Sequence, residues 1–307
     1  MVSSCLLTGN TIGLYSYEGL TTVSDCVVIG NGEAGLFNTG HFGPNDSITG
    51  HGSMTISDSI ISDNSGPGVW NYFSLTIVNS TLSGNRAGDG LDGGGIRSGT
   101  IKAPGGVTVI NSTISGNSAS GSGGGIAIYY WGLSVVNSTI SGNSAGQVGG
   151  GIANYTGGAQ VSNSTVSGNS ATSGGGIYND GTIEISNTIL NAGAFGENVV
   201  NDGGTVTSHG YNISSDDGGG VLTGPGDQIN TDPLLGPLRD HGGPTLTHVP
   251  MRGSPAIEAG DPSFTLPPDH DQRGAYYYRV FGPRIDVGSV ETQPQPRCVT
   301  PAPRPHP

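Results

Sequence analysis

Short apolar runs alternate with polar residues along most of the chain, and Gly, Asn and Ser separate one run from the next. Alternation with a period of two indicates β-strands with one buried face, and no run is long enough for a buried helix. A clear example is the run Val107-Thr108-Val109-Ile110, which is followed by the heptapeptide NSTISGN at residues 111–117. The pattern therefore predicts an all-β protein.

The heptapeptide is part of a repeat. Strong or weak copies of it start at Ser4, Asp25, Asp58, Asn79, Asn111, Asn137, Asn163 and Asn187. Several copies are followed by Gly-Gly-Gly-Ile or a close variant, at residues 93–96, 123–126, 149–152 and 174–177. A period of about 21 to 33 residues built from strands predicts a solenoid in which parallel strands stack turn on turn. We expect a parallel β-helix of about eight or more rungs, a rung being one turn of the coil.

Residues at one repeat position should stack from rung to rung. Two apolar columns are expected inside, one of Ile114, Ile140 and Val166 and the other of Ile96, Ile126, Ile152 and Ile177. The last Asn of the motif should form a hydrogen-bonded ladder at a corner, through Asn85, Asn117, Asn143 and Asn169. Cys5 and Cys26 share a repeat position, which leaves either a small buried column or a disulfide between adjacent rungs.

A different series of motifs begins near residue 205. It includes DPLLGPL at 232–238, GSPAIEAGD at 253–261, DQRG at 271–274 and DVGSVE at 286–291. This ordered series resembles the C-terminal region of bacterial choice-of-anchor Q surface proteins, and the rungs resemble the β-helix that precedes it there. The rungs are also similar to polymorphic outer-membrane protein repeats. The resemblance implies a right-handed, pectate-lyase-like β-helix on a secreted or surface-displayed bacterial protein, without assigned catalytic residues.

Three parts of the chain are expected. Residues 1–204 form rungs, and the N-terminus is predicted to be truncated because no export segment precedes the first rung. Residues 205–291 add the last rungs and an irregular cap over the solenoid end, which ion pairs could pin. The residues expected to form these pairs are Asp271, Arg273, Asp286 and Glu291. Residues 292–307 are Pro-rich and should form a disordered tail.

Composition and charge exclude several classes of protein. Gly accounts for 57 of 307 residues, which suits a coil with many tight corners. The net charge is −13, and nucleic-acid binding needs clustered basic residues, so neither nucleic acid nor an anionic membrane is an expected partner. No segment is apolar enough to span a bilayer. We expect no cofactor; Ca²⁺ is compatible with the acidic chain, but no motif supports it. The oligomeric state stays open.

The first functional hypothesis is a structural or adhesive surface module that binds carbohydrate or another host or cell-surface ligand. The candidate ligand-binding residues are Trp70, Tyr72, Tyr129, Tyr130 and Trp131. Both groups follow an inner-column residue, Val69 or Ile126, by similar distances, so they are predicted to lie on one side of the rod. Exposed aromatic rings stack on sugars, although these rings could instead cover an exposed strip of the core.

Two alternatives use other residues. A polysaccharide lyase or glycoside hydrolase would need carboxylates and a basic group, and the weak candidates lie in one inserted loop: Arg86, Asp89, Asp92 and Arg97. The low charge of the rod argues against catalysis. An ice-binding face would use an outward Thr-x-Ser array, formed by Thr81 and Ser83, Thr113 and Ser115, Thr139 and Ser141, and Thr165 and Ser167.

Overall fold

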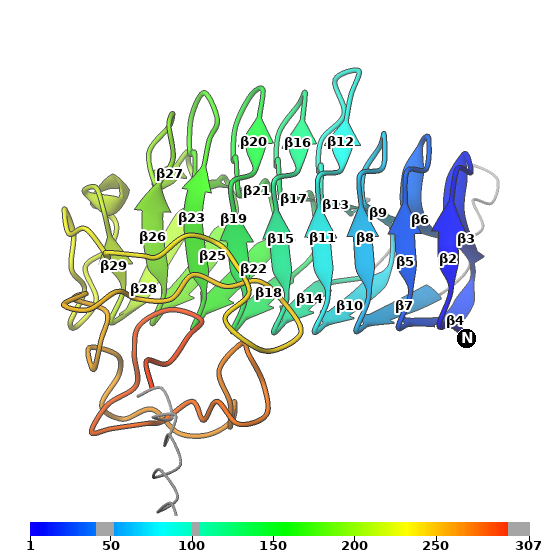
Figure 1. Cartoon of the computed structure of the whole chain (residues 1–307). Helices are drawn as coiled ribbons and strands as arrows, with labels where there is room; N and C mark the ends of the chain where they lie inside the picture. The colour runs from blue at the N-terminus through cyan, green and yellow to red at the C-terminus, as the bar shows by residue number, and fades with distance from the viewer. Residues whose placement is uncertain (41–51, 100–104, 294–307) are drawn as a thin grey trace, which may run out of the picture.

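The chain forms a rod of stacked rungs, followed by an irregular C-terminal segment (Figure 1). The structure is a computed structural model, and it describes residues 1–40, 52–99 and 105–293. Within these ranges the coil makes nine rungs, and neighbouring strands in its sheets run parallel. The fold is a right-handed parallel β-helix, as predicted. The predicted tail lies outside the described residues from position 294 onward.

Three long sheets form the sides of the rod, and within each sheet the strands stack in the order in which they follow along the chain. Sheet A contains β1 (Val2–Ser3), β4 (Gly19–Ser24), β7 (Gly52–Ser57), β10 (Ser74–Val78), β14 (Val107–Ile110), β18 (Leu133–Val136), β22 (Gly158–Ser162), β25 (Thr182–Ser186) and β28 (Thr205–Gly210). Sheet B contains β2 (Leu6–Thr8), β5 (Val27–Ile29), β8 (Ile60–Ser62), β11 (Thr81–Ser83), β15 (Thr113–Ser115), β19 (Thr139–Ser141), β23 (Thr165–Asn169), β26 (Ile189–Ala192) and β29 (Ile213–Ser214).

Sheet C forms the third side of the rod. It contains β3 (Ile12–Tyr17), β6 (Ala34–Thr39), β9 (Val69–Asn71), β13 (Ile96–Ser98), β17 (Ile126–Ile128), β21 (Ile152–Asn154), β24 (Ile177–Asn179) and β27 (Val199–Asn201). A small sheet lies at the corner between sheets B and C, with strands β12 (Arg86–Ala87), β16 (Ser118–Ala119) and β20 (Ser144–Ala145).

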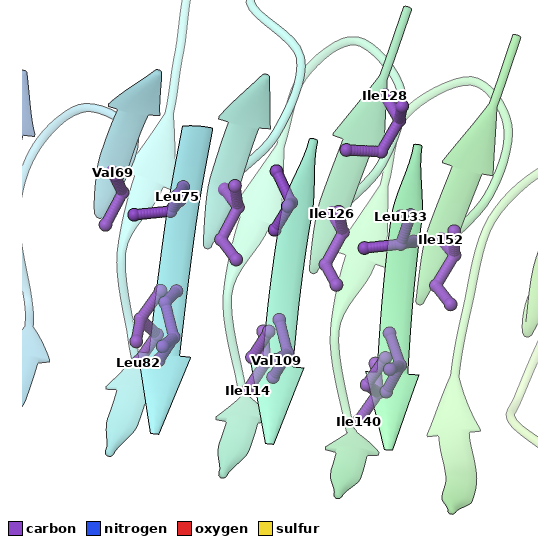
Figure 2. Packing of buried hydrophobic residues seen from close by; sticks show 14 of the residues in the cluster. Val69, Leu75, Leu82, Val109, Ile114, Ile126, Ile128, Leu133, Ile140 and Ile152 are labelled. Atoms are coloured by element: carbon purple, nitrogen blue, oxygen red, sulfur yellow. The ribbon is translucent and has the colours of Figure 1, made fainter. Parts of the chain in front are cut away.

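The narrow interior contains the predicted apolar columns. Ile114 pairs in register with Ile140, and Ile140 pairs with Val166; all three are at most 1% exposed. The Ile126 column of sheet C is equally buried, and Val109 and Leu133 of sheet A add to the same core (Figure 2). Burying one such side chain contributes roughly 1.5–3 kcal/mol, so each rung stabilises its neighbours but cannot stand alone.

The predicted asparagine ladder is present at the corner that follows sheet B. Asn117 Nδ2 donates to Asn143 Oδ1 at 3.0 Å, and Asn143 Nδ2 donates to Asn169 Oδ1 at 2.9 Å. Each amide also donates to a backbone carbonyl, as Asn143 does to Ile114 at 2.9 Å. The ladder continues to the first rungs through Asn85, Asn64, Asn31 and Asn10. These bonds satisfy polar groups that the corner buries.

Glycine is required where the chain enters sheet C. Gly123, the first residue of a Gly-Gly-Gly-Ile element, has a φ of +66°, and a Cβ there would lie 2.7 Å from the Ala127 Cβ. Gly149 has the same conformation one rung further on, with a φ of +65°. The left-handed backbone and the close approach together exclude a side chain, which explains why this element repeats.

The two N-terminal cysteines stack as predicted. The Sγ atoms of Cys5 and Cys26 are 2.6 Å apart, and both residues are free thiols. The Cys26 thiol lies 3.2 Å from the Ser24 carbonyl, in the position that the Ser59 hydroxyl takes against Ser57 in the next rung. Burial raises the pKa of the Cys5 thiol to about 11. Of the two alternatives left open by the sequence, the structure contains the small column.

The C-terminal end of the rod is closed by a short stretch and not by the whole C-terminal region. The 3₁₀ turn η2 (Gly218–Gly220) leads into Val221 and Leu222, which pack against the end of the core. The later residues, 230–293, are called the C-terminal segment below. They run back along the outer face of sheet B and cross β26, β23 and β19 (Figure 1). Within the predicted region 205–291, the first part adds the last rungs and closes the solenoid end, whereas the expected placement over that end was wrong for residues 230–291.

This placement also overturns the expected ice-binding array. Thr113, Thr139 and Thr165 do project outward from sheet B, but they are at most 1% exposed. The Thr113 hydroxyl donates to the Leu246 carbonyl at 2.6 Å, and the Thr139 hydroxyl donates to Gln272 Oε1 at 2.6 Å. The C-terminal segment thus covers this face at three of the four predicted rungs, and only the β11 rung keeps a partly exposed pair.

The charged residues predicted to pin the region do interact, but they act within the segment. Arg273 Nη2 lies 2.6 Å from Asp271 Oδ2 and donates to the Glu291 carbonyl at 2.6 Å. The Glu291 carboxylate accepts from the Asp286 amide at 2.9 Å. Attachment to the rod uses other residues, among them Gln272 and the fully buried Arg279, which donates to Asn163 Oδ1 at 3.2 Å.

Candidate ligand-binding face on sheet C

The outer face of sheet C carries a column of aromatic rings. Its register pairs Tyr15 with Phe37, Phe37 with Trp70, and Trp70 with Arg97. The ring centroids of Tyr15 and Phe37 are 5.1 Å apart, and those of Phe37 and Trp70 are 5.2 Å apart with an edge-on angle of 74°. The Arg97 guanidinium lies 4.6 Å from the centre of the Trp70 ring. The column is continuous over four rungs, because each strand places the residue after its inner apolar residue outward.

A second column lies two residues further along the same strands, where each strand leads into a turn. Tyr72 belongs to it, with its ring 5.7 Å from Phe37. The rings of Tyr129 and Tyr155 stack at 5.2 Å and 13°, and Tyr155 lies 6.2 Å from Tyr178 in the first column. Aromatic residues therefore cover the face from its first rung to β24, with Arg97 near the middle.

A hollow of about 280 Å³ lies beside the first column. Trp70 lines it together with Glu33 and Asp89, and the remaining wall comes from loop residues such as Ser65 and Leu91. Glu33 and Asp89 are both exposed. The hollow thus joins an aromatic ring to two carboxylates that can accept hydrogen bonds from hydroxyl groups.

Asp92 lies on the same face but is already engaged. Its carboxylate accepts hydrogen bonds from the Ser122 amide and from the Tyr129 hydroxyl. Burial raises the pKa of Tyr129, and the bond to Asp92 raises it further. The bond from Tyr178 to Asp202 raises the pKa of Tyr178 to about 12. These tyrosines are therefore protonated donors at neutral pH, which suits binding and not proton abstraction.

The structure brings together residues that the sequence assigned to two different hypotheses. Trp70, Tyr72 and Tyr129 share the sheet C face, as predicted, and Asp92 and Arg97 from the enzymatic set contact that face directly. Arg86 does not join them, because its strand belongs to the small corner sheet and its side chain is exposed there. The structure therefore separates Arg86 from the other three catalytic candidates, Asp89, Asp92 and Arg97, which lie on or beside the sheet C face.

The remaining two aromatic candidates lie in the turn between β17 and β18. Tyr130 is 42% exposed, with its ring 6.4 Å from Tyr129. Trp131 is partly buried in the same turn and lies outside both columns. Sequence adjacency to Tyr129 had suggested that all three rings share one face, but successive residues of a turn point in different directions.

Five aromatic residues of the face were missed: Tyr15, Tyr17, Phe37, Tyr155 and Tyr178. Their positions relative to the inner column could have revealed them. Phe37 and Tyr178 directly follow the buried residues Leu36 and Ile177, as Trp70 follows Val69. Tyr155 follows Ile152 by three residues, the same interval that separates Tyr129 from Ile126.

The described part of the chain contains no group of three or more His, Cys, Asp or Glu residues arranged to hold a metal ion. Within the same ranges no helix is long and apolar enough to cross a membrane. Comparisons with protein-family models, curated proteins and solved structures find no match to this chain. The fold and the geometry of the face are therefore the basis of the functional argument.

Proposed function

We propose that the chain is a secreted or cell-surface β-helix module that binds carbohydrate through the outer face of sheet C. The observation that supports this most is the Tyr15–Phe37–Trp70–Arg97 column with the hollow beside Trp70. Aromatic faces pack against the C–H faces of sugar rings, while the nearby carboxylates and guanidinium bind hydroxyl groups. The resemblance of the C-terminal motifs to choice-of-anchor Q proteins supports a surface location.

The preferred ligand is a neutral oligosaccharide. Glu33 and Asp89 line the hollow, and the chain has a net charge of −13, so an anionic glycan would meet repulsion at this face. An extended chain suits the site, because the aromatic column follows the long axis of the rod across several rungs spaced about 4.8 Å apart.

A glycan array followed by titration tests the proposal. The protein has two tryptophans. Trp70→Ala removes a ring of the first column, and Trp131→Phe, which changes the tryptophan outside both columns, is its comparison variant. We expect Trp70→Ala to weaken binding of an array-selected neutral glycan about tenfold, since losing an aromatic contact costs on the order of 1.5 kcal/mol. Trp131→Phe should bind within about twofold of the parent. An array without binding, or binding that Trp70→Ala leaves intact, would contradict the proposal.

A carbohydrate-active enzyme on the same fold is the second candidate. It is favoured by Asp89, whose exposed carboxylate lines the hollow together with Glu33. A hydrolase needs two carboxylates that face one scissile bond. Release of reducing ends from the array-selected glycan, abolished by Asp89→Asn but not by Asp63→Asn outside the hollow, would establish catalysis. Binding without release would support the binding module.

A further inference from the structure

The C-terminal segment forms a hollow of about 660 Å³. Small-molecule sites usually measure roughly 300–1,000 Å³. The walls relevant here are Arg239, His241, Pro250, Met251, Arg273 and Tyr277. The hollow is remote in sequence from the aromatic face of sheet C.

Arg239 is held in a defined orientation at the rim. Its backbone pairs with Thr247, with N–H to O distances of 3.2 and 3.0 Å. Its Nε donates to His241 Nε2 at 2.9 Å, and His241 Nδ1 lies 3.0 Å from the Thr247 carbonyl. His241 therefore carries its proton on Nδ1 and accepts at Nε2. Burial lowers the pKa of His241, with the nearby Arg239 charge adding to the effect, which keeps the ring neutral.

The terminal nitrogens of Arg239, Nη1 and Nη2, have no hydrogen-bond partner among the described residues. Arg273 contributes a second guanidinium to the lining of the hollow. Its Nε and Nη2 are held by Asp271 and by the Glu291 carbonyl, and its plane stacks 3.9 Å from the centre of the Tyr277 ring. Its Nη1 is likewise without a partner within those ranges. Two oriented guanidinium groups thus have donors to spare at one hollow.

The acidic residues around this hollow already have partners, and Asp271 is paired with Arg273 at 2.6 Å. Asp240 Oδ1 accepts from the Gly242 amide at 2.8 Å within its own turn. The Glu291 side chain is fully buried and accepts from the amides of Phe281 and Asp286. Burial, together with the Asp286 charge, raises the pKa of Glu291 to about 8, so this carboxyl is mostly neutral at pH 7. The Nη nitrogens of Arg239 and Nη1 of Arg273 are therefore the donors that these acidic groups leave without a partner among the described residues.

We propose that this hollow binds a carboxylate-bearing ligand of monosaccharide size. A carboxylate matches the donors of an oriented guanidinium, and such charge-assisted bonds are stronger than neutral ones. Pro250 and the half-exposed Met251 give the hollow an apolar wall against which the body of the ligand packs. The site is chemically distinct from the sheet C face, where carboxylates, and not arginines, line the hollow.

Calorimetric titration of the whole chain with D-glucuronate and D-glucose tests the proposal, because these two sugars differ only in the carboxylate. We expect glucuronate to bind and glucose not to bind at concentrations up to about 10 mM. Arg239→Gln should weaken glucuronate binding about tenfold or more, since it removes charge-assisted hydrogen bonds to the carboxylate. The exposed Arg252 lies in the same segment outside the hollow, so Arg252→Gln is the charge-matched control and should stay within about twofold.

Five outcomes would overturn the proposal. One is that neither sugar binds, and another is that both bind equally. A third is that Arg239→Gln and Arg252→Gln weaken binding to the same extent, which would indicate a general charge effect. The fourth is that inorganic sulfate binds as tightly as glucuronate, which would indicate a bare anion site. Trp70→Ala should leave glucuronate binding unchanged; a loss there would place the sugar on sheet C instead and would also overturn the assignment.

Discussion

The rod and the C-terminal segment bury polar side chains in two different ways. In the rod, a buried amide such as Asn143 repeats the contacts of the equivalent amides above and below it. In the segment, Gln272 is just as buried, but its contacts occur once. It donates to Thr113 and Thr245 and accepts from Thr139. The buried polar groups of the rod are satisfied by hydrogen bonds that repeat from rung to rung. Those of the segment are satisfied by hydrogen bonds that occur only once.

The two kinds of contact also differ in the length of chain that they close. Asn117 and Asn143 are 26 residues apart, whereas Thr139 and Gln272 are separated by 133. Loop-closure entropy grows with the intervening length, and nearest-neighbour contacts in a solenoid add up rung by rung. The rod should therefore be the stable scaffold, and the segment should detach before the rod unfolds. Three predictions test this contrast.

The largest effect is expected inside the rod. Asn143→Ala removes an amide that bonds to two ladder neighbours and to the Ile114 carbonyl, and it leaves buried groups of Asn117 unpaired. We expect a loss of about 3–5 kcal/mol in the free energy of unfolding, measured by urea denaturation. Asn10 ends the same ladder at an exposed position, so Asn10→Ala should cost less than about 1 kcal/mol. Equal losses at both positions would contradict a ladder that depends on burial.

A smaller, local effect is expected where the segment meets the rod. Gln272→Ala removes the bonds to Thr113, Thr139 and Thr245 and should weaken attachment by about 2–3 kcal/mol. Limited proteolysis should then cut within residues 230–293 faster, while the urea midpoint of the rod stays in place. Gln160 is an exposed glutamine on sheet A, and Gln160→Ala should change neither measurement. A common shift of rod and segment would show that the two unfold together.

The smallest effect concerns pH. Burial raises the pKa of Glu291 to about 8 and also raises the pKa of Asp286. The folded segment thus holds protons that the unfolded chain has released above about pH 4.5, so its stability is greatest at low pH and falls as the pH rises through 8. The loss should be on the order of 1 kcal/mol between pH 7 and pH 8.

Hydrogen exchange of the segment, followed across this pH window and corrected for intrinsic rates, measures that loss. Glu291→Gln mimics the protonated carboxyl and should flatten the dependence, whereas the exposed Glu184→Gln on sheet A should leave it as it is. A segment that becomes more protected as the pH rises would contradict the assignment of a neutral Glu291.

Much of the aromatic face of sheet C could be predicted from the sequence, because strand register follows from the repeat. Trp70 and Tyr129 were assigned to one side of the rod from their distances to Val69 and Ile126, and Tyr155 and Tyr178 obey the same intervals. The hydrogen bond between Asp92 and Tyr129 could not be predicted from the sequence. It depends on how a loop without a repeat partner folds back over sheet C, and no periodic signal describes such a loop.

The sequence by itself determined the rod. Its period, the apolar columns, the asparagine ladder and the glycine corners all follow from residues that recur every 21 to 33 positions, because identical rungs impose identical local environments. Only the tertiary structure decided where residues 230–293 lie. Their contacts with the rod, such as that of Gln272 with Thr139, join unlike residues far apart in the chain. The fit between an irregular segment and the outer face of sheet B is therefore a matter of three-dimensional complementarity, and that fit buries the threonines that the pattern alone placed in solvent.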